Sequence, residues 1–363
     1  MPAQGSNSLA DPVNADRTEV LRESVARAFA DAAPLRIRGG DSKAFYGRRA
    51  AGEVLDVAGH RGIVAYEPSE LVLTARAGTP LAEVEAALAG HRQMLPFEPP
   101  HFGPGATLGG TVACGLSGPR RPYAGAARDF VLGAQVVSGR GEVLRFGGQV
   151  MKNVAGYDVS RLMVGALGTL GVLLEVSVKV LPAPAHEMTL VLETDARTAI
   201  ETMNRLAGRP LPISAACHAG DRLYLRLSGS ESGVEAARVA LGGETADGSF
   251  WQALREHRLP FFAGDGPLWR LSVPPTAPPL DLAGPMLLDW GGAQRWVRSD
   301  AGEARVRQVA DSAGGHATLF RGGDRGGTVF HPLAPPLAAL HRRLKAAFDP
   351  AGILNPGRFC MEF

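Results

Sequence analysis

The chain has 363 residues, 45% of them hydrophobic, and a formal net charge of +2. This length is typical of two domains or of one domain with a large insertion, and the near-neutral charge gives no reason to expect nucleic acid as a partner. No stretch approaches the roughly 20 apolar residues of a membrane span. Residues 1–15 are polar and predict a disordered N-terminal segment, which lacks the apolar region of a signal peptide.

The first hundred residues predict short strands and two helices. Apolar positions three and four apart predict a helix over 17–33, begun by Asp16 and Glu19 as a capping box. Thr79 and Pro80 predict the start of a second helix, with Thr79 as its N-cap. Short strands are expected over residues 35–37, 54–57, 62–65 and 71–77.

The segment Arg38-Gly39-Gly40-Asp41-Ser42-Lys43 directly follows the first of these strands. Two glycines, a small hydroxyl and a lysine at a strand end are suited to wrap a pyrophosphate, because backbone N–H groups hold the oxygens and the lysine offsets their charge. The spacing matches neither a Walker A loop nor a Rossmann fingerprint. A simple turn is the alternative interpretation.

The stretch 102–121, FGPGATLGGTVACGLSGPRR, is dominated by small residues. Such a run has too little side-chain volume for a core, but it lets the backbone approach something large and flat. Interleaved apolar residues, Leu108, Val112 and Leu116 among them, favour a buried segment over a glycine-rich surface loop. The stretch therefore predicts one wall of a cofactor site.

The remaining chain predicts a hairpin, a long strand and then a region in which strands and helices alternate. The hairpin strands are expected over 130–137 and 142–146, a short helix is expected to open at 154–158, and a strand with alternating apolar residues over 172–181. From about 186 to 330 strands and helices alternate, which predicts an antiparallel sheet with helices on one face. The expected strands are 189–192, 223–227, 268–273, 286–289 and 295–297, and the expected helices are 196–206, 234–241, 302–312 and 336–348.

Five motifs follow one another in a specific order: RGGDSK, GATLGG, KNVAGYD, GTLGV and, near the end, FDPAGILNPGR. In this order they resemble the FAD-binding domain of the vanillyl-alcohol-oxidase (PCMH-type) family, and within it the glycolate oxidase subunits. The resemblance covers about half of the chain and its tail. It implies an α+β fold: a two-lobed PCMH-type FAD-binding domain over 1–182, an inserted antiparallel α+β cap domain over 183–330, and a C-terminal segment, 331–363, that returns to the FAD domain.

The resemblance also implies which residues bind FAD. Many relatives carry in the first loop a histidine that bonds covalently to FAD, whereas this chain has Asp41 and Ser42 there, so we expect non-covalent binding. The implied cofactor-binding residues are Gly39, Gly40, Asp41, Ser42, Lys43, Gly105, Ala106, Thr107, Gly109, Gly110, Cys114, Gly115, Leu116, Ser117, Gly168, Gly171, Val172 and Asn355.

Two further departures concern the polar groups of relatives. The sequence Gly165-Ala166-Leu167-Gly168 stands where relatives often have Gly-Ser-Glu-Gly, which removes a carboxylate. Relatives that oxidise 2-hydroxyacids carry a GDGNxH signature in the cap, and this chain lacks it. The only similar segment, His218-Ala219-Gly220-Asp221, predicts a hairpin turn instead.

Oxidation of a 2-hydroxyacid needs an arginine for the carboxylate, a base for the hydroxyl proton and a flavin that takes hydride. The candidates for the catalytic residues are His316, Arg321 and His331, with structural roles as the alternative. No HxH or HExxH spacing is present, so no metal site is expected.

The resemblance implies an FAD-dependent oxidoreductase acting on CH–OH groups, as a subunit of a glycolate oxidase or dehydrogenase complex. The implied partners are a second FAD-containing subunit, with the fuller substrate site, and an iron–sulfur subunit. The cysteines at 114, 217 and 360 lie far apart with no CxxC pair, so this chain is not expected to hold a cluster or a disulfide framework. We hypothesise that its flavin relays electrons while the sister subunit oxidises glycolate to glyoxylate.

Two alternatives stay open at this point. One is a self-sufficient FAD-dependent 2-hydroxyacid dehydrogenase, and the other is a non-catalytic scaffold that has lost its flavin. The expected location is the cytoplasm, or the periphery of the inner membrane reached indirectly through the complex.

Overall fold

The first half of the chain forms a five-stranded sheet and two small pairs of strands. The computed structural model describes residues 14–148 and 158–361; most of the KNVAGYD motif and of the expected disordered N-terminal segment lies outside the described residues. The strands are β1 (Leu35–Arg38), β2 (Glu53–Asp56), β3 (Ile63–Glu67), β4 (Val72–Arg76), β5 (Gln93–Met94), β6 (Val131–Val137), β7 (Val143–Gly147), β8 (Val172–Lys179) and β9 (Leu181–Pro182). The helices are α1 (Thr18–Ala30), α2 (Leu81–Ala89), α3 (Leu108–Cys114), α4 (Arg121–Ala124), α5 (Ala127–Phe130) and α6 (Val159–Leu162). Within the described ranges the large sheet has the order β3-β4-β8-β6-β7, and β1 pairs in parallel with β2.

The second half forms an eight-stranded antiparallel sheet, which we call the cap sheet. Its strands are β10 (His186–Glu193), β11 (Ile213–Ala219), β12 (Arg222–Gly229), β13 (Glu244–Ala246), β14 (Leu268–Ser272), β15 (Met286–Asp289), β16 (Gln294–Arg298) and β17 (His316–Arg321). The helices of this half are α7 (Ala196–Ala207), α8 (Glu231–Leu241), α9 (Ser249–Arg255), α10 (Glu303–Ser312) and α11 (Pro335–Phe348), with 3₁₀ turns η1 (Pro260–Phe262) and η2 (Trp290–Gly292). In the described part of the chain the strand order is β13-β10-β12-β11-β15-β16-β14-β17.

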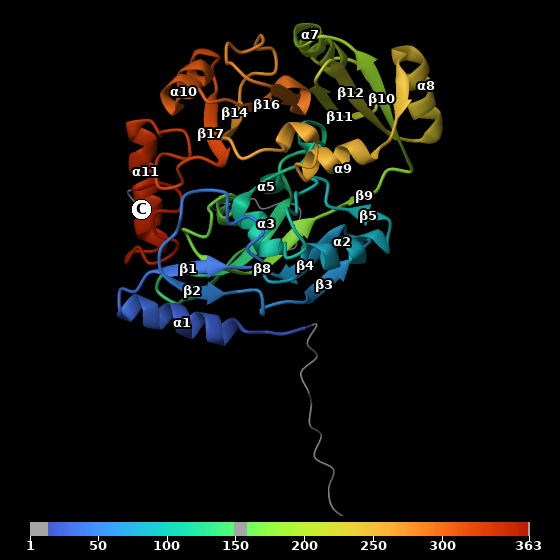
Figure 1. Cartoon of the computed structure of the whole chain (residues 1–363). Coiled ribbons are helices and arrows are strands. Elements are labelled where there is room, and N and C mark those ends of the chain that lie inside the picture. Colours follow the sequence, from blue (N-terminus) through green and yellow to red (C-terminus); the bar gives the residue numbers. More distant parts are fainter. Residues whose placement is uncertain (1–13, 149–157, 362–363) are drawn as a thin grey trace, which may run out of the picture.

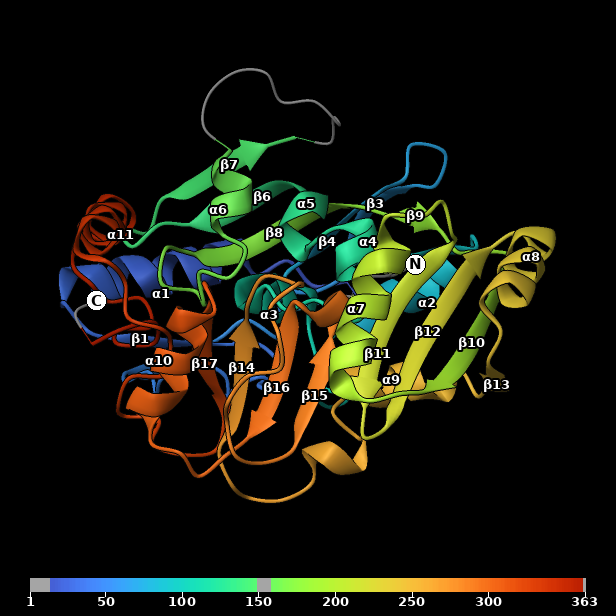
Figure 2. The same cartoon turned by 90° about the horizontal axis from the view of Figure 1, so that it is seen from above.

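The two halves lie one above the other (Figure 1), and the view from above shows α7, α8 and α10 around the cap sheet (Figure 2). The chain then returns, because α11 runs down one side of the molecule to the lower half. This is the predicted α+β arrangement, and the hairpin of β6 and β7 is where the sequence predicts it.

Strand β8 lies in the middle of the five-stranded sheet, and both of its faces are covered. Val172, Val176 and Val178 are fully buried, as their alternation predicts. Ser177, on the other face, is also buried, and its hydroxyl lies 2.8 Å from that of Thr74 on β4. A hydroxyl pair of this kind satisfies the hydrogen bonds that burial would otherwise leave unmade.

The starts of two helices differ from the prediction. The N-cap of α2 is Pro80 rather than Thr79, because the Thr79 hydroxyl bonds with the backbone of Gly62 in the loop before β3. The N-cap of α1 is Arg17, so Asp16 lies one position too early for a capping box. Its carboxylate still accepts a hydrogen bond from the Thr18 N–H at 2.9 Å.

The expectation of helices on one face of the cap sheet is only partly right. Helices α7, α8 and α10 pack on its outer face, through apolar clusters that include Met203, Val234 and Val306. Helix α9, which the sequence analysis missed, lies below the sheet, between it and the lower half (Figure 1). Its Trp251 and Leu254 belong to a cluster with residues of both halves. The inner face of the sheet is therefore also covered.

Candidate functional site

A pocket of about 880 Å³ lies in the lower half, and we call it the glycine-lined pocket. This volume includes open solvent at the mouth of the pocket. It is bounded by the loop after β1, by α3, by the turn before β8 and by the C-terminal segment after α11. Its lining residues are Arg36, Ile37, Arg38, Gly39, Gly40, Asp41, Ser42, Lys43, Ala44, Ala50, Val57, Ala77, Thr107, Gly109, Gly110, Ala113, Cys114, Leu167, Gly168, Gly171, Leu173, Asn355 and Arg358.

The two glycine-containing loops predicted to share a ligand touch each other directly. A Cβ atom added at Gly40 would lie 1.3 Å from the carbonyl oxygen of Gly105, and one at Gly39 would lie 2.7 Å from the hydroxyl oxygen of Thr107. Such distances are far below van der Waals contact, so side chains are excluded at both positions. The loops 39–43 and 105–110, far apart in the sequence, thus form adjoining parts of one site.

Helix α3 forms the wall of small residues. Thr107 is its N-cap, and its hydroxyl accepts a hydrogen bond from the Gly110 N–H at 3.2 Å. Gly109 packs so closely on Ala77, directly after β4, that an added Cβ would lie 2.6 Å from the Ala77 Cβ. The helix ends at Gly115, which has a left-handed φ of 62°. Glycine lowers helix propensity, and here the close approach of helix and strand requires it.

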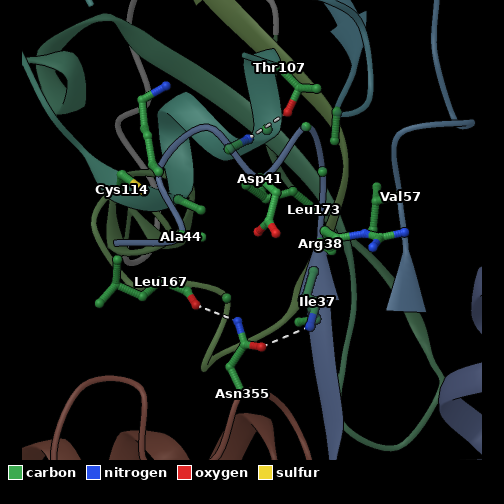
Figure 3. A pocket seen from close by; sticks show the side chains of 18 of the residues that line it. Ile37, Arg38, Asp41, Ala44, Val57, Thr107, Cys114, Leu167, Leu173 and Asn355 are labelled. Carbon is green, nitrogen blue, oxygen red and sulfur yellow. Dashed lines mark hydrogen bonds between the residues drawn. The ribbon is translucent and has the colours of Figure 1, made fainter. Parts of the chain in front are cut away.

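Asn355 fastens the C-terminal segment to the pocket (Figure 3). Its side-chain oxygen accepts a hydrogen bond from the Ile37 N–H at 2.8 Å, and its amide nitrogen donates to the Leu167 carbonyl at 2.7 Å. Asn355 is buried and has a φ of 44°, a conformation that asparagine tolerates better than most residues. It therefore positions two walls of the pocket.

Positive charge predominates among the lining side chains. Arg36, Arg38, Lys43 and Arg358 line the pocket, against the single carboxylate of Asp41 among the described lining residues. Backbone N–H groups of a glycine loop together with cations suit an anionic ligand such as a pyrophosphate. The lack of room for a Cβ at Gly39 and Gly40, together with this charge, fits a large dinucleotide whose phosphates lie against the backbone.

Lys43 and Cys114 are the two titratable groups most enclosed by the pocket walls. Burial lowers the pKa of Lys43, whereas the charges of Cys114 and Glu256 favour its protonated form. Burial raises the pKa of the Cys114 thiol, and the charges of Lys43 and Arg358 counteract that effect. The Lys43 ammonium donates to the carbonyl of His101 at 3.3 Å, so a polar contact already holds it beside the 101–110 stretch.

Most of the predicted cofactor-binding residues line this pocket, and six do not. Gly105 packs against Gly40 of the 39–43 loop, and Gly115 ends α3. Leu116 and Val172 are buried in apolar clusters, Ala106 is buried beside α2, and the Ser117 hydroxyl accepts a hydrogen bond from the Ala127 N–H. The residues that line the pocket without having been predicted include Arg36, Arg38, Val57, Ala77, Leu167 and Arg358. Arg36 and Arg38 alternate with Ile37 on β1, and this alternation was the available signal.

The three candidates for catalysis do not converge on the pocket, since neither His316, Arg321 nor His331 is among its described lining residues. His331 accepts a hydrogen bond from the Ala317 N–H at 3.3 Å, and its other ring nitrogen lies 3.0 Å from the Asp311 carboxylate. The Arg321 guanidinium lies over the ring of Phe45, 4.3 Å from its centroid. His316 is exposed at the start of β17.

Aromatic side chains occupy the region between the loop after Lys43 and the inner face of the cap sheet. His257 stacks on Phe262 with a centroid distance of 3.9 Å, and Phe320 contacts Trp296 at 4.8 Å. Burial and the charges of nearby arginines hold the pKa of His257 well below its usual range. We call the following residues the aromatic cluster: Phe45, Tyr46, Phe102, His257, Phe262, Trp296 and Phe320.

Residues 14–148 and 158–361 contain no group of three or more His, Cys, Asp or Glu side chains that could hold a metal ion. They also contain no helix long and apolar enough to cross a membrane.

Comparison with known protein families defines the class. Residues 13–147 match the model of the FAD binding domain, and residues 332–359 match that of the FAD linked oxidases, C-terminal domain. Most residues that line the glycine-lined pocket lie within these two matches, and the turn before β8 and the start of that strand contribute the rest. The protein is an FAD-linked oxidoreductase, and FAD is its cofactor.

The particular family follows from a full-length relative. The chain is 54% identical, over 347 residues, to the glycolate oxidase subunit GlcE of Escherichia coli, covering 96% of this chain and 98% of that protein. The chain belongs to the family of glycolate oxidase GlcE subunits. It is also 43% identical over 86 residues to the glycolate oxidase subunit GlcD of Bacillus subtilis, a match that covers 24% of this chain and 18% of that one.

A solved structure shows the same fold at low sequence identity. Alkyldihydroxyacetonephosphate synthase matches with a TM-score of 0.65 and 14% identity, covering 94% of this chain and 75% of that one. The fold expected from the order of the motifs is thereby confirmed.

Proposed function

We propose that this chain binds FAD non-covalently in the glycine-lined pocket and relays electrons within a glycolate oxidase complex. In that complex glycolate, a small 2-hydroxyacid, is oxidised to glyoxylate, mainly on a second flavoprotein subunit. The observation that carries the proposal is the meeting of the 39–43 loop with the 105–110 loop. The family membership supplies the substrate.

Different residues contact different parts of FAD in this proposal. Gly39 and Gly40 present backbone N–H groups, and Lys43 supplies positive charge to the pyrophosphate. Small residues of α3, Gly110 and Cys114 among them, let a planar ring lie against the helix. FAD, when bound, accepts and returns electrons. Arg358 ties the tail to the loop by donating to the carbonyl oxygen of Ala44 at 3.1 Å.

The aromatic cluster favours a relay over direct substrate oxidation. A carboxylate substrate needs a cation and a base that face the flavin. In the described part of the cap, the groups that contact the pocket loops include aromatic rings, the Arg321 and Arg270 guanidiniums over Phe45 and Tyr46, and the Glu256 carboxylate, which already accepts from two backbone N–H groups. His331 is engaged by Ala317 and Asp311. These contacts favour structural roles for Arg321 and His331.

The proposal includes partners and a division into domains. We place a second FAD-containing subunit and an iron–sulfur subunit beside this chain, because electrons that reach its flavin need an exit. We assign residues 1–182 and 331–363 to the FAD-binding domain and 183–330 to the cap. The complex would be cytoplasmic, with peripheral contact to the inner membrane through its partners.

The test is anaerobic reduction of the isolated, FAD-loaded chain with glycolate. The relay predicts that its flavin stays oxidised over the time in which the assembled complex turns over, and that it is reduced once the partner flavoprotein is added. Dithionite, a non-specific reductant, is the control that shows a reducible flavin.

Other outcomes favour the alternatives. Rapid bleaching of the isolated chain by glycolate would contradict the relay and indicate a self-sufficient 2-hydroxyacid dehydrogenase. A colourless chain that takes up no FAD, yet still captures the other subunits, would indicate a scaffold.

A further inference from the structure

One carboxylate of the cap half reaches the glycine-lined pocket from outside it. Glu256 follows α9 directly, and its side chain is 3% exposed. Its carboxylate accepts hydrogen bonds from the Phe102 N–H at 2.9 Å and from the His101 N–H at 3.2 Å. Arg255 donates to the same carboxylate at 2.9 Å. Three donors thus converge on one buried anion, which is the condition for burying a charge.

The backbone that Glu256 holds leads straight into the wall of the pocket. Phe102 has a left-handed φ of 52°, which costs energy for an aromatic residue and needs outside support. Three residues later, Gly105 touches Gly40. The carbonyl of His101 accepts the hydrogen bond of the Lys43 ammonium at 3.3 Å. Glu256 therefore fixes the group to which Lys43 is bonded.

The charges around Lys43 come from three separate elements. Cys114 on α3 and Glu256 after α9 favour its protonated form, while burial opposes it. Arg358 from the C-terminal segment donates to the Lys43 carbonyl at 3.4 Å. Among these described neighbours Glu256 is the one carboxylate, whereas Cys114 is a thiol whose pKa burial raises.

We propose that Glu256 is a positioning residue of the flavin site: it holds the 101–102 backbone in place and keeps the Lys43 ammonium charged toward the FAD phosphates. The inference rests on the proposed FAD pocket. It makes the cap half a contributor to cofactor binding, although the described lining of the pocket comes from the other half and the tail.

The direct test follows the protonation of Lys43 without flavin. The chain has lysines only at positions 43, 152, 179 and 345, so lysine labelled with ¹³C at Cε gives few resonances. The resonance that is missing from the spectrum of Lys43→Met is that of Lys43. Glu256→Gln keeps an oxygen that accepts from the backbone and removes the charge. We expect the titration midpoint of Lys43 to fall by about 0.5–1 pH unit in this variant, with Lys179 and Lys345 unmoved.

A second measurement links the charge to the cofactor. FAD affinity of the apoprotein should decrease as pH rises through the midpoint of Lys43, because the ammonium is lost, and in Glu256→Gln the decrease should begin at lower pH. In the Lys43→Met background the same substitution should change the pH profile little. Glu256→Asp, which keeps the charge, should restore the wild-type midpoint. Glu85→Gln is the matched control, since Glu85 contacts the His101 ring rather than its backbone.

Failure of the inference is distinguishable from failure of the proposed function. An unchanged Lys43 midpoint in Glu256→Gln would overturn the role of Glu256, whether or not FAD binds. A shift of the FAD profile that persists in the Lys43→Met background would also overturn it. A wild-type chain that takes up no FAD would instead contradict the proposed function.

Discussion

The side-chain amide of Asn355 donates a hydrogen bond to the carbonyl of Leu167 at 2.7 Å, although 188 positions separate the two residues. The same side chain accepts from Ile37 on β1. One residue of the tail thus joins the first strand of the chain to the turn before β8. This arrangement explains why the family match resumes at residues 332–359: the pocket is incomplete until the tail returns.

Replacing Asn355 by alanine should destabilise the protein and weaken FAD binding together. The change leaves the partly buried Ile37 N–H and the buried Leu167 carbonyl without these partners and places alanine at a φ of 44°. We expect a loss of about 2–4 kcal/mol in the free energy of unfolding, measured by urea denaturation. Asn204→Ala is the control, because Asn204 also donates to two carbonyls but lies on α7. Equal losses in both variants would argue against a special role for Asn355.

Gly40→Ala should strongly weaken FAD binding. The added Cβ would lie 1.3 Å from the Gly105 carbonyl oxygen, so the two loops must separate. We expect FAD affinity to fall by about 100-fold or more, roughly 2.7 kcal/mol, measured by flavin fluorescence during titration of the apoprotein. In the control, Gly248→Ala, the Cβ meets nothing within 4 Å. Normal FAD content in Gly40→Ala would show that the loops are not held together by this contact.

The sequence predicts those parts of the fold that local pattern determines. Strand β8 and the hairpin of β6 and β7 follow from alternation and turn residues. Helix α9 and strands β11, β13 and β17 are not predicted from the sequence. Trp251 of α9 and the small buried residues Ala215 and Ala216 of β11 are explained by contacts with distant segments.

The candidate site is also predictable only in part from the sequence. The glycines of the two loops are visible in the sequence because their lack of side chains is itself the signal. The partners of Asn355 and Glu256 are not, since each bond joins segments more than 150 positions apart. For Thr79 the local pattern gives a wrong prediction: the residue is suited to cap α2, but its hydroxyl bonds with the backbone of Gly62 instead.

The pH dependence of stability should include a contribution from Asp289. Burial, as the largest cause, raises the pKa of Asp289 to about 7, although Trp290 and Gln294 donate hydrogen bonds to it. The folded state therefore retains a proton that the unfolded state loses near pH 4, so this group's contribution to stability decreases as pH rises from about 4 through about 7.

Asp289→Asn should therefore flatten that dependence. We expect the fall in Tm between about pH 5 and about pH 8 to shrink by an amount equivalent to about 2–3 kcal/mol. Asparagine still accepts from the Trp290 N–H, and a turned Gln294 amide satisfies its other end. Asp281→Asn, at an exposed carboxylate paired with Arg305, should leave the dependence unchanged. An unaltered slope in Asp289→Asn would mean that Asp289 is ionised throughout.

The last prediction concerns the buried pair that folds the tail back. The Lys345 ammonium donates to the Asp349 carboxylate at 2.6 Å and to the carbonyls of Thr169 and Leu354, both at 2.9 Å. Asp349 in turn accepts from the Leu354 N–H at 2.7 Å. Lys345 is thus the one buried residue of α11 within the described chain, and it is a cation with all three protons engaged.

Lys345→Met should cost more stability than a lost surface charge, because it leaves the Asp349 carboxylate buried without its counterion. Breaking such a pair costs about 3–5 kcal/mol, and the turn at Thr169, next to Gly168 in the pocket lining, loses its anchor. We expect a lower urea midpoint and faster proteolysis of the tail, partly restored by saturating FAD because the ligand binds only the folded pocket. Lys179→Met is the control at a half-buried strand end, with an expected change below about 1 kcal/mol. If FAD protected Lys345→Met no better than the control, the tail and the cofactor would not be coupled through this pair.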